Sequence, residues 1–178
     1  MKPESKTTTL DVRPIGARAL KSAIDTLRPY LFGATILDLY SGQGRFGFAC
    51  LQEHSSRVIF VENNKHLSAE IVVRTHNLKK EALVQVVCTD ALRFLAGVAK
   101  KNERFDIVFA DPPFPFWNSR FESELLRSVL VVMKSDSIFL VKYPTRMIAC
   151  KTISSLWKSS VFGESKLVYF KYGKEQGN

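Results

Sequence analysis

The amino-acid sequence predicts an α/β protein: a doubly wound, mostly parallel sheet with helices on both faces. Two observations support this prediction. Five short segments are apolar almost throughout, which is typical of strands that are buried on both faces of a parallel sheet. Segments with a helical spacing of apolar residues separate them, as the crossovers between parallel strands require.

The predicted elements follow one another in a regular order. Residues 1–11 show no periodicity and are expected to be flexible, a single domain is expected over residues 12–173, and a flexible tail over residues 174–178. The predicted strands cover residues 35–40, 57–62, 83–88, 105–110 and 137–143. The predicted helices cover residues 13–27, 46–53, 65–78, 91–99 and 121–133.

The last part of the chain departs from this alternation. A helix is predicted over residues 148–157, followed by a turn at Gly163 and a strand over residues 166–172. This order suggests a hairpin-like return of the chain onto the sheet edge. An antiparallel last strand would distinguish the fold from the plain Rossmann fold of dehydrogenases.

The charge of the chain indicates a polyanionic partner. Lysine and arginine outnumber aspartate and glutamate by 26 to 17, which gives a net charge of +9, and the surplus lies near the two ends of the sequence. Because Lys and Arg bind phosphates and release counterions, we expect a nucleic-acid partner. A basic surface that serves solubility is the alternative.

Metal sites and membrane spans find no support in the sequence. The three cysteines and the three histidines lack the spacing of metal ligands, so no metal is expected. No apolar run approaches the ~20 residues of a membrane span and the N-terminus is polar, so we expect a cytoplasmic protein. We also expect a monomer.

A glycine-rich turn follows the first predicted strand. Residues 38–47 (DLYSGQGRFG) place a G-x-G-x-x-G pattern between a strand and a helix, as a nucleotide-binding turn requires. Gly42 and Gly44 would let the backbone approach a ligand, and Gly47 would let the helix pack close to the strand. A tight turn without a ligand is the alternative.

Acidic residues at three strand ends favour one cofactor. Asp38 would repel a pyrophosphate, whereas S-adenosylmethionine has no phosphate and carries an ammonium and a sulfonium that an acid can orient. Glu62, at the end of the second strand, is placed to accept hydrogen bonds from ribose hydroxyls. Asp90 could receive the adenine amino group, cap the following helix, or do both.

The segment Asp111-Pro112-Pro113-Phe114, at the end of the fourth strand, suits the modification of a base. An exocyclic amino group is a poor nucleophile because its lone pair is delocalised into the ring. The Asp111 carboxylate and the Pro112 carbonyl could hold its hydrogens and direct the nitrogen at a methyl group. The prolines would stiffen the loop, and Phe114 offers a face for a flipped-out base.

With these motifs in this order, the sequence resembles the class I amino-methyltransferases, and within them the bacterial 16S rRNA guanine-N2 methyltransferases of the RsmD type. The resemblance covers about residues 12–173 and rests on Arg13-Pro14 and on residues 37–47, 60–64, 89–91, 105–114 and 162–173. It implies a Rossmann-like sheet of seven strands, S-adenosylmethionine as methyl donor, and N2 of a guanine in 16S rRNA or the assembled small ribosomal subunit as acceptor.

The matching positions give the site that the resemblance implies. The cofactor would be held by Asp38, Tyr40, Gly42, Gly44, Glu62, Asn63, Asp90 and Ala91. The catalytic loop would be Asp111, Pro112, Pro113 and Phe114. The substrate would also contact Arg13, Phe116 and Trp117, with core packing as an alternative for Trp117.

Two departures from the family pattern and three alternative functions stay open. A short polar segment stands where the family has a basic hairpin, and Arg45 and Phe46 are bulkier than expected in the turn. Adenine-N6 methylation of DNA or RNA would use the same loop chemistry. A nucleotide-dependent oxidoreductase is disfavoured by Asp38, and a non-enzymatic RNA-binding module would leave Asp111 unexplained.

Overall fold

A computed structural model of the chain describes residues 15–148 and 155–173. The helices are α1 (Ala17–Leu31), α2 (Arg45–Gln52), α3 (Lys65–Asn77), α4 (Ala91–Lys100) and α5 (Ser119–Leu130), with short helical turns η1 (Glu81–Leu83) and η2 (Phe114–Phe116). The strands are β1 (Thr35–Leu39), β2 (Arg57–Glu62), β3 (Val84–Cys88), β4 (Phe105–Ala110), β5 (Met133–Pro144), β6 (Ser155–Phe162) and β7 (Ser165–Tyr172). In these two ranges, no helix has the length and apolar character that crossing a membrane requires.

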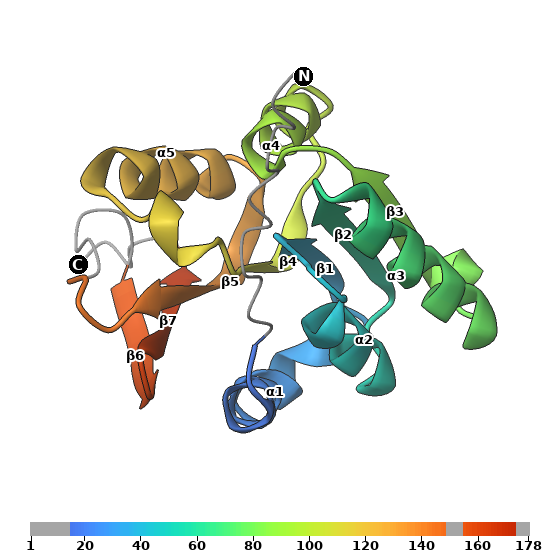
Figure 1. Ribbon diagram of the computed structural model, residues 1–178, viewed down its shortest axis with the longest axis horizontal. Coiled ribbons are helices and arrows are strands. Elements are labelled where there is room, and N and C mark those ends of the chain that lie inside the picture. The colour runs from blue at the N-terminus through green and yellow to red at the C-terminus, as the bar shows by residue number, and fades with distance from the viewer. Residues whose placement is uncertain (1–14, 149–154, 174–178) are drawn as a thin grey trace, which may run out of the picture.

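The strands form one seven-stranded sheet in the order β3-β2-β1-β4-β5-β7-β6 (Figure 1). Strands β1 to β5 pair in parallel, and β7 runs antiparallel to both β5 and β6. This topology confirms the predicted doubly wound α/β sheet and its antiparallel last strand. The strand order reverses between β1 and β4, which is where open α/β sheets bind their ligands.

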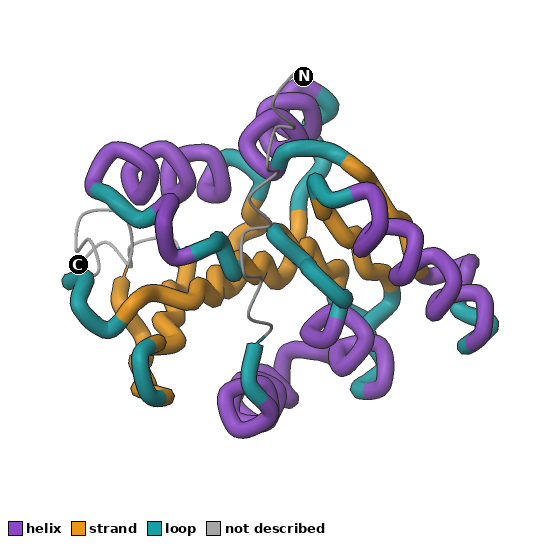
Figure 2. Tube along the Cα trace, in the orientation of Figure 1, coloured by secondary structure: helices purple, strands orange, loops and turns teal. Residues whose placement is uncertain are grey.

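Helices cover both faces of the sheet, as Figures 1 and 2 show. Side chains of β2 and β4 alternate between the two layers: Phe60 and Phe109 pack with α1, α2 and α3, whereas Val61 and Val108 pack with α4 and α5. Because both faces are buried, the strands read as continuous apolar runs in the sequence. Each large apolar side chain buried in this way contributes about 1.5–3 kcal/mol.

Helix α1 extends beyond its predicted end. It continues through Pro29 to Leu31, whereas the sequence indicated an end before Arg28. The proline lies in the last helical turn, and the fully buried Leu27 and Leu31 anchor this turn in the core. The free energy gained by packing therefore outweighs the helical hydrogen bond that is lost because proline has no N–H.

The helix predicted over residues 148–157 is wrong where the structure describes this segment. Ser155 to Trp157 belong to β6, and residues 149–154 lie outside the described residues. Strand β6 pairs with β7 across a two-residue turn in which Gly163 has a φ of +59°, so hairpin hydrogen bonds override the helical spacing. A bulge between Leu156 and Lys158 breaks the alternation that would have marked a strand.

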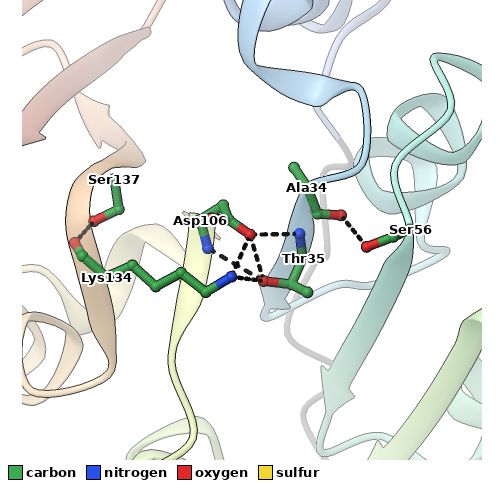
Figure 3. A network of polar contacts seen from close by, with 6 residues as sticks. All are labelled: Ala34, Thr35, Ser56, Asp106, Lys134 and Ser137. Carbon is green, nitrogen blue, oxygen red and sulfur yellow. Dashed lines mark hydrogen bonds and ion pairs between the residues drawn. The ribbon is translucent and has the colours of Figure 1, made fainter.

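A polar network joins the strand starts, at the end of the sheet away from the glycine turn (Figure 3). The Asp106 carboxylate accepts hydrogen bonds from the Thr35 N–H at 2.8 Å, the Thr35 hydroxyl at 2.7 Å and the Lys134 ammonium at 2.7 Å. These contacts fix the beginnings of β1, β4 and β5 relative to one another. They also support the early start of β5 at Met133, four residues before its predicted start.

Candidate active site

The predicted acidic residues meet at the carboxyl edge of the sheet. Asp38 lies near the end of β1, Glu62 ends β2, and Asp111 directly follows β4. The Asp111 N–H donates to the carbonyl of Leu39 at 3.3 Å, so the start of the proline loop lies beside the start of the glycine turn. The structure thus brings together three residues that lie far apart in the sequence.

The glycine turn requires its glycines for two different reasons. Gly42 and Gly44 have φ values of +54° and +70°, in the left-handed region that favours glycine. A Cβ on Gly47 would lie 2.3 Å from a ring carbon of Phe60. Gly47 therefore lets helix α2 pack closely on strand β2, which lies beside the strand that precedes the turn.

Asp38 is a buried carboxylate with one oxygen unsatisfied. The residue is only 1% exposed. One oxygen accepts the N–H of Gly47 at 3.0 Å, and the other has no hydrogen-bond partner among the described residues. Burial raises the pKa of Asp38, and the negative charges of Asp111 and Glu62 raise it further. A cationic ligand would satisfy this carboxylate, so the site fits an ammonium or a sulfonium group.

Glu62, which was predicted to bind the ribose, holds the glycine turn in this structure. Its two oxygens accept the N–H groups of Gly42 at 2.8 Å and of Asn64 at 2.9 Å. Each carboxylate oxygen can accept a second hydrogen bond, so these contacts leave capacity for a ribose hydroxyl. Asn63 is exposed next to it, and its carbonyl lies 3.9 Å from the Cys88 thiol.

Asp90 caps helix α4. Its side chain accepts the N–H of Arg93 at 2.9 Å, which confirms the capping alternative. The residue is exposed, so the predicted contact with adenine stays compatible with this cap. Ala91 is 3% exposed and packs into the core, so only its backbone could contact a cofactor.

An aromatic cluster links the glycine turn to the proline loop. Tyr40 has a φ of +56°, and its ring centroid lies 6.4 Å from those of Phe116 and Phe121. Phe116 and Phe121 are 5.8 Å apart. Burial raises the pKa of Tyr40, so its hydroxyl stays neutral. The sequence indicated Tyr40 and Phe116 but not Phe121.

Other predicted residues contact protein rather than open space. Trp117 is 8% exposed and its ring lies 4.3 Å from that of Tyr143, which favours the core-packing alternative. Arg45 donates to the carbonyl of Ile15 at 3.1 Å, and Phe46 packs 4.3 Å from Phe109. The bulky residues of the turn therefore face the protein, and Arg13 lies outside the described residues.

Lys142 is the site residue that the sequence did not reveal. Its ammonium lies 2.6 Å and 2.8 Å from the two oxygens of Asp111, and the two side chains are 9% and 12% exposed. Burial raises the pKa of Asp111 to about 6, although Lys142 opposes the shift. The ammonium also lies 5.6 Å from the ring centroid of Phe114. The sequence feature that could have revealed Lys142 is a single lysine near the end of the apolar strand β5, which lies next to β4.

Two curated relatives match more than half of the chain. The Haemophilus influenzae protein named ribosomal RNA small subunit methyltransferase D is 31% identical over 106 residues, which are 59% of this chain and 54% of that protein. The Escherichia coli K12 protein of the same name is 29% identical over 103 residues, which are 58% of this chain and 50% of that protein. The chain thus spans about half the length of these relatives.

Solved structures share the fold over most of the chain. The Escherichia coli protein yhhF matches with a TM-score of 0.80 at 21% identity, covering 92% of this chain and 89% of that one. The Thermus thermophilus 16S rRNA N2 methyltransferase RsmC, solved with AdoMet and guanosine, matches with a TM-score of 0.74 at 15% identity. That match covers 93% of this chain and 45% of the other. At these identities the likeness concerns the fold alone.

The family comparison covers nearly the whole sequence. The family described as conserved hypothetical protein 95 matches residues 4–171, which include the glycine turn, the acidic strand ends and the proline loop. The curated relatives carry the name of the RsmD type that these motifs indicated. The chain therefore belongs to the conserved hypothetical protein 95 family, which is the RsmD family.

Proposed function

We propose that this protein is an S-adenosylmethionine-dependent methyltransferase that acts on N2 of a guanine in 16S rRNA. The observation that carries the proposal is the position of Asp111, a buried carboxylate beside a glycine turn built on Asp38 and Glu62. It lies where the strand order reverses, the usual ligand site of such sheets. Family membership and the names of the curated relatives support ribosomal RNA as the substrate class.

The glycine turn and its acidic neighbours would hold the cofactor. The unsatisfied oxygen of Asp38 would attract the cationic methionine part, and Glu62 would accept hydrogen bonds from the ribose. Asp90 would reach the adenine amino group with the oxygen that does not cap α4. When bound, S-adenosylmethionine supplies an electrophilic methyl group on its sulfonium.

The proline loop would hold the target base. Phe114 would stack on the flipped-out guanine, while the Asp111 carboxylate and the Pro112 carbonyl accept the hydrogens of its amino group. The nitrogen lone pair forms the new N–C bond, and the nitrogen then loses a proton. With a pKa of about 6, Asp111 is ionised at neutral pH and can accept that proton before passing it to water.

The test is transfer of radiolabelled methyl groups from S-adenosylmethionine to unmodified small ribosomal subunits and to total RNA, followed by nucleoside analysis. We expect label in N2-methylguanosine, and its loss in Asp111→Ala with cofactor affinity kept within a few-fold. Asp106→Ala, at the other end of the same strand, is the matched control and should keep its activity per folded protein.

Each other outcome changes a different part of the proposal. Label in N6-methyladenosine would keep the reaction and replace the substrate base. No label in any nucleoside would overturn the methyltransferase activity. Full turnover by Asp111→Ala would overturn the role of the carboxylate.

A further inference from the structure

We propose that Lys142 is a positioning residue for methyl transfer, whose ammonium keeps the Asp111 carboxylate ionised and fixed beside the target base. The inference rests on the proposed function, because it assigns a further residue to the same site. Lys142 acts through Asp111 and through the ring of Phe114, without itself touching the reacting atoms.

The sheet register explains how the pair forms. Ala110 pairs with Val141 in the parallel ladder between β4 and β5, so the next residues, Asp111 and Lys142, lie side by side on the same face. The ammonium contacts both carboxylate oxygens, at 2.6 Å and 2.8 Å. A carboxylate held at both oxygens by a neighbouring strand has a fixed plane and direction.

Stability alone does not account for this lysine. Removing both charges of a buried pair from water costs several kcal/mol, and apolar residues of similar volume are often as stable or more stable. Residues 138–141 (IFLV) are apolar and Lys142 is 7% exposed, so an apolar residue would continue the strand. A charge retained at this position points to a role in the chemistry of Asp111.

The charges around Asp111 show what the ammonium opposes. Burial favours the neutral form of Asp111. The negative charge of Asp111 in turn raises the pKa of Asp38, so the two carboxyl groups interact. Lys142 is the neighbouring cation that favours the carboxylate. The same ammonium lies 5.6 Å from the ring centroid of Phe114, within cation–π range. The Lys142 ammonium thus contacts both the carboxylate that would accept the amino hydrogens and the ring on which the base would stack.

The protonation state of Asp111 decides whether it can serve the amine. An ionised carboxylate only accepts hydrogen bonds, whereas the neutral acid also carries an O–H donor that would face the hydrogens of the amino group. Without Lys142, burial would keep Asp111 neutral at higher pH. The methyl-transfer rate would then rise only at more alkaline pH.

The experiment is the pH dependence of kcat/KM for RNA between about pH 5 and 9, with saturating S-adenosylmethionine. The wild-type rate should rise through about pH 6. In Lys142→Met this rise should move up by about two pH units, so that the rate falls about tenfold near pH 7 and recovers near pH 9. Lys142→Arg should restore the wild-type profile.

The matched control is Lys134→Met, which removes the other lysine that joins β5 to an aspartate of β4. Its profile should superimpose on that of the wild type. If Lys142→Met does not fold, Lys142→Gln removes the charge but keeps a hydrogen-bond donor, and the same alkaline shift is expected.

An unshifted profile in whichever of these two uncharged variants folds would overturn the inference and leave the proposed function intact. A shift in Lys142→Arg as large as in the uncharged variants would overturn the role of the charge. Absence of methyl transfer by the wild-type protein would instead overturn the proposed function.

Discussion

Strands β4 and β5 are joined by two pairs of the same chemical type, one at each end. At the strand starts, Lys134 and Asp106 are 41% and 36% exposed, and at the strand ends Lys142 and Asp111 are 9% and 12% exposed. Partial burial favours the protonated form of Asp106, yet hydrogen bonds from Lys134 and Thr35 lower its pKa. For Asp111 burial prevails over its lysine.

The difference lies in the hydrogen bonds that accompany each ion pair. Asp106 accepts a backbone N–H and a hydroxyl from Thr35 in addition to the lysine, so its charge is well compensated. At Asp111 the compensation against burial comes from the lysine. The two pairs have the same chemical type and join the same two strands, but they differ in role. The pair at the strand starts holds the strands together, whereas the pair at the strand ends contains an acid whose pKa depends on its lysine.

The largest expected effect concerns stability after loss of one lysine. Lys142→Met should lower the free energy of unfolding by about 3 kcal/mol or more, because it leaves a buried carboxylate without its partner. Lys134→Met should cost at most about 1 kcal/mol, since that pair is exposed and Thr35 still binds the aspartate. Urea denaturation of both variants measures the difference.

The double variant Asp111→Asn with Lys142→Met is the control for this prediction, because it removes both buried charges. It should recover most of the lost stability. Equal losses in Lys142→Met and Lys134→Met would show that the two pairs do not differ in the way that their exposure indicates.

The next effect concerns how stability depends on pH. The folded-state pKa of Asp111, about 6, lies above the ordinary 3.8, so its contribution to stability is full below pH 4 and is lost as the pH rises through 6. The loss should be roughly 2–3 kcal/mol. Asp106 has a lowered pKa, so its contribution exists above pH 4 and is lost on acidification.

Both signs can be checked by measuring the free energy of unfolding between pH 3 and 8. The proteins to compare are the wild type and two double variants, each lacking one pair. Relative to the wild type, the variant without the Asp111 pair should gain stability as the pH rises. The variant without the Asp106 pair should gain on acidification. A common sign for both would contradict the comparison.

The smallest effect concerns salt. The coupling free energy of Asp106 and Lys134 in a double-mutant cycle should be about 0.2–1 kcal/mol and should shrink between 50 mM and 1 M salt, because exposed charges are screened. The coupling of Asp111 and Lys142 should change little, because burial keeps mobile ions away. Parallel salt responses would mean that solvent reaches both pairs equally.

Sequence patterns predicted the parts of the fold that depend on burial. Strands β2 and β4 have the predicted bounds, because each is an apolar run between polar turns. The first three residues of β6 were assigned to a helix, because the pairing of this strand with β7 and its bulge depend on contacts between strands. Such contacts between strands produce no regular spacing of apolar residues in the sequence.

The candidate site shows the same division. Asp38, Glu62 and Asp111 could be identified because each ends or follows an apolar strand, and parallel strands end at one edge. Lys142 could not, because its importance comes from the register of β5 against β4. A side chain whose role is set by the neighbouring strand needs the structure to be found.

The bulge in β6 has a consequence for self-association. Strand β6 forms an outer edge of the sheet, where unpaired backbone groups can template the addition of a strand from another molecule. The bulge between Leu156 and Lys158 bends this edge and interrupts its regular hydrogen-bonding pattern, and the exposed lysine adds charge there. The irregularity that hides the strand from sequence patterns thus also makes it a poor seed for aggregation.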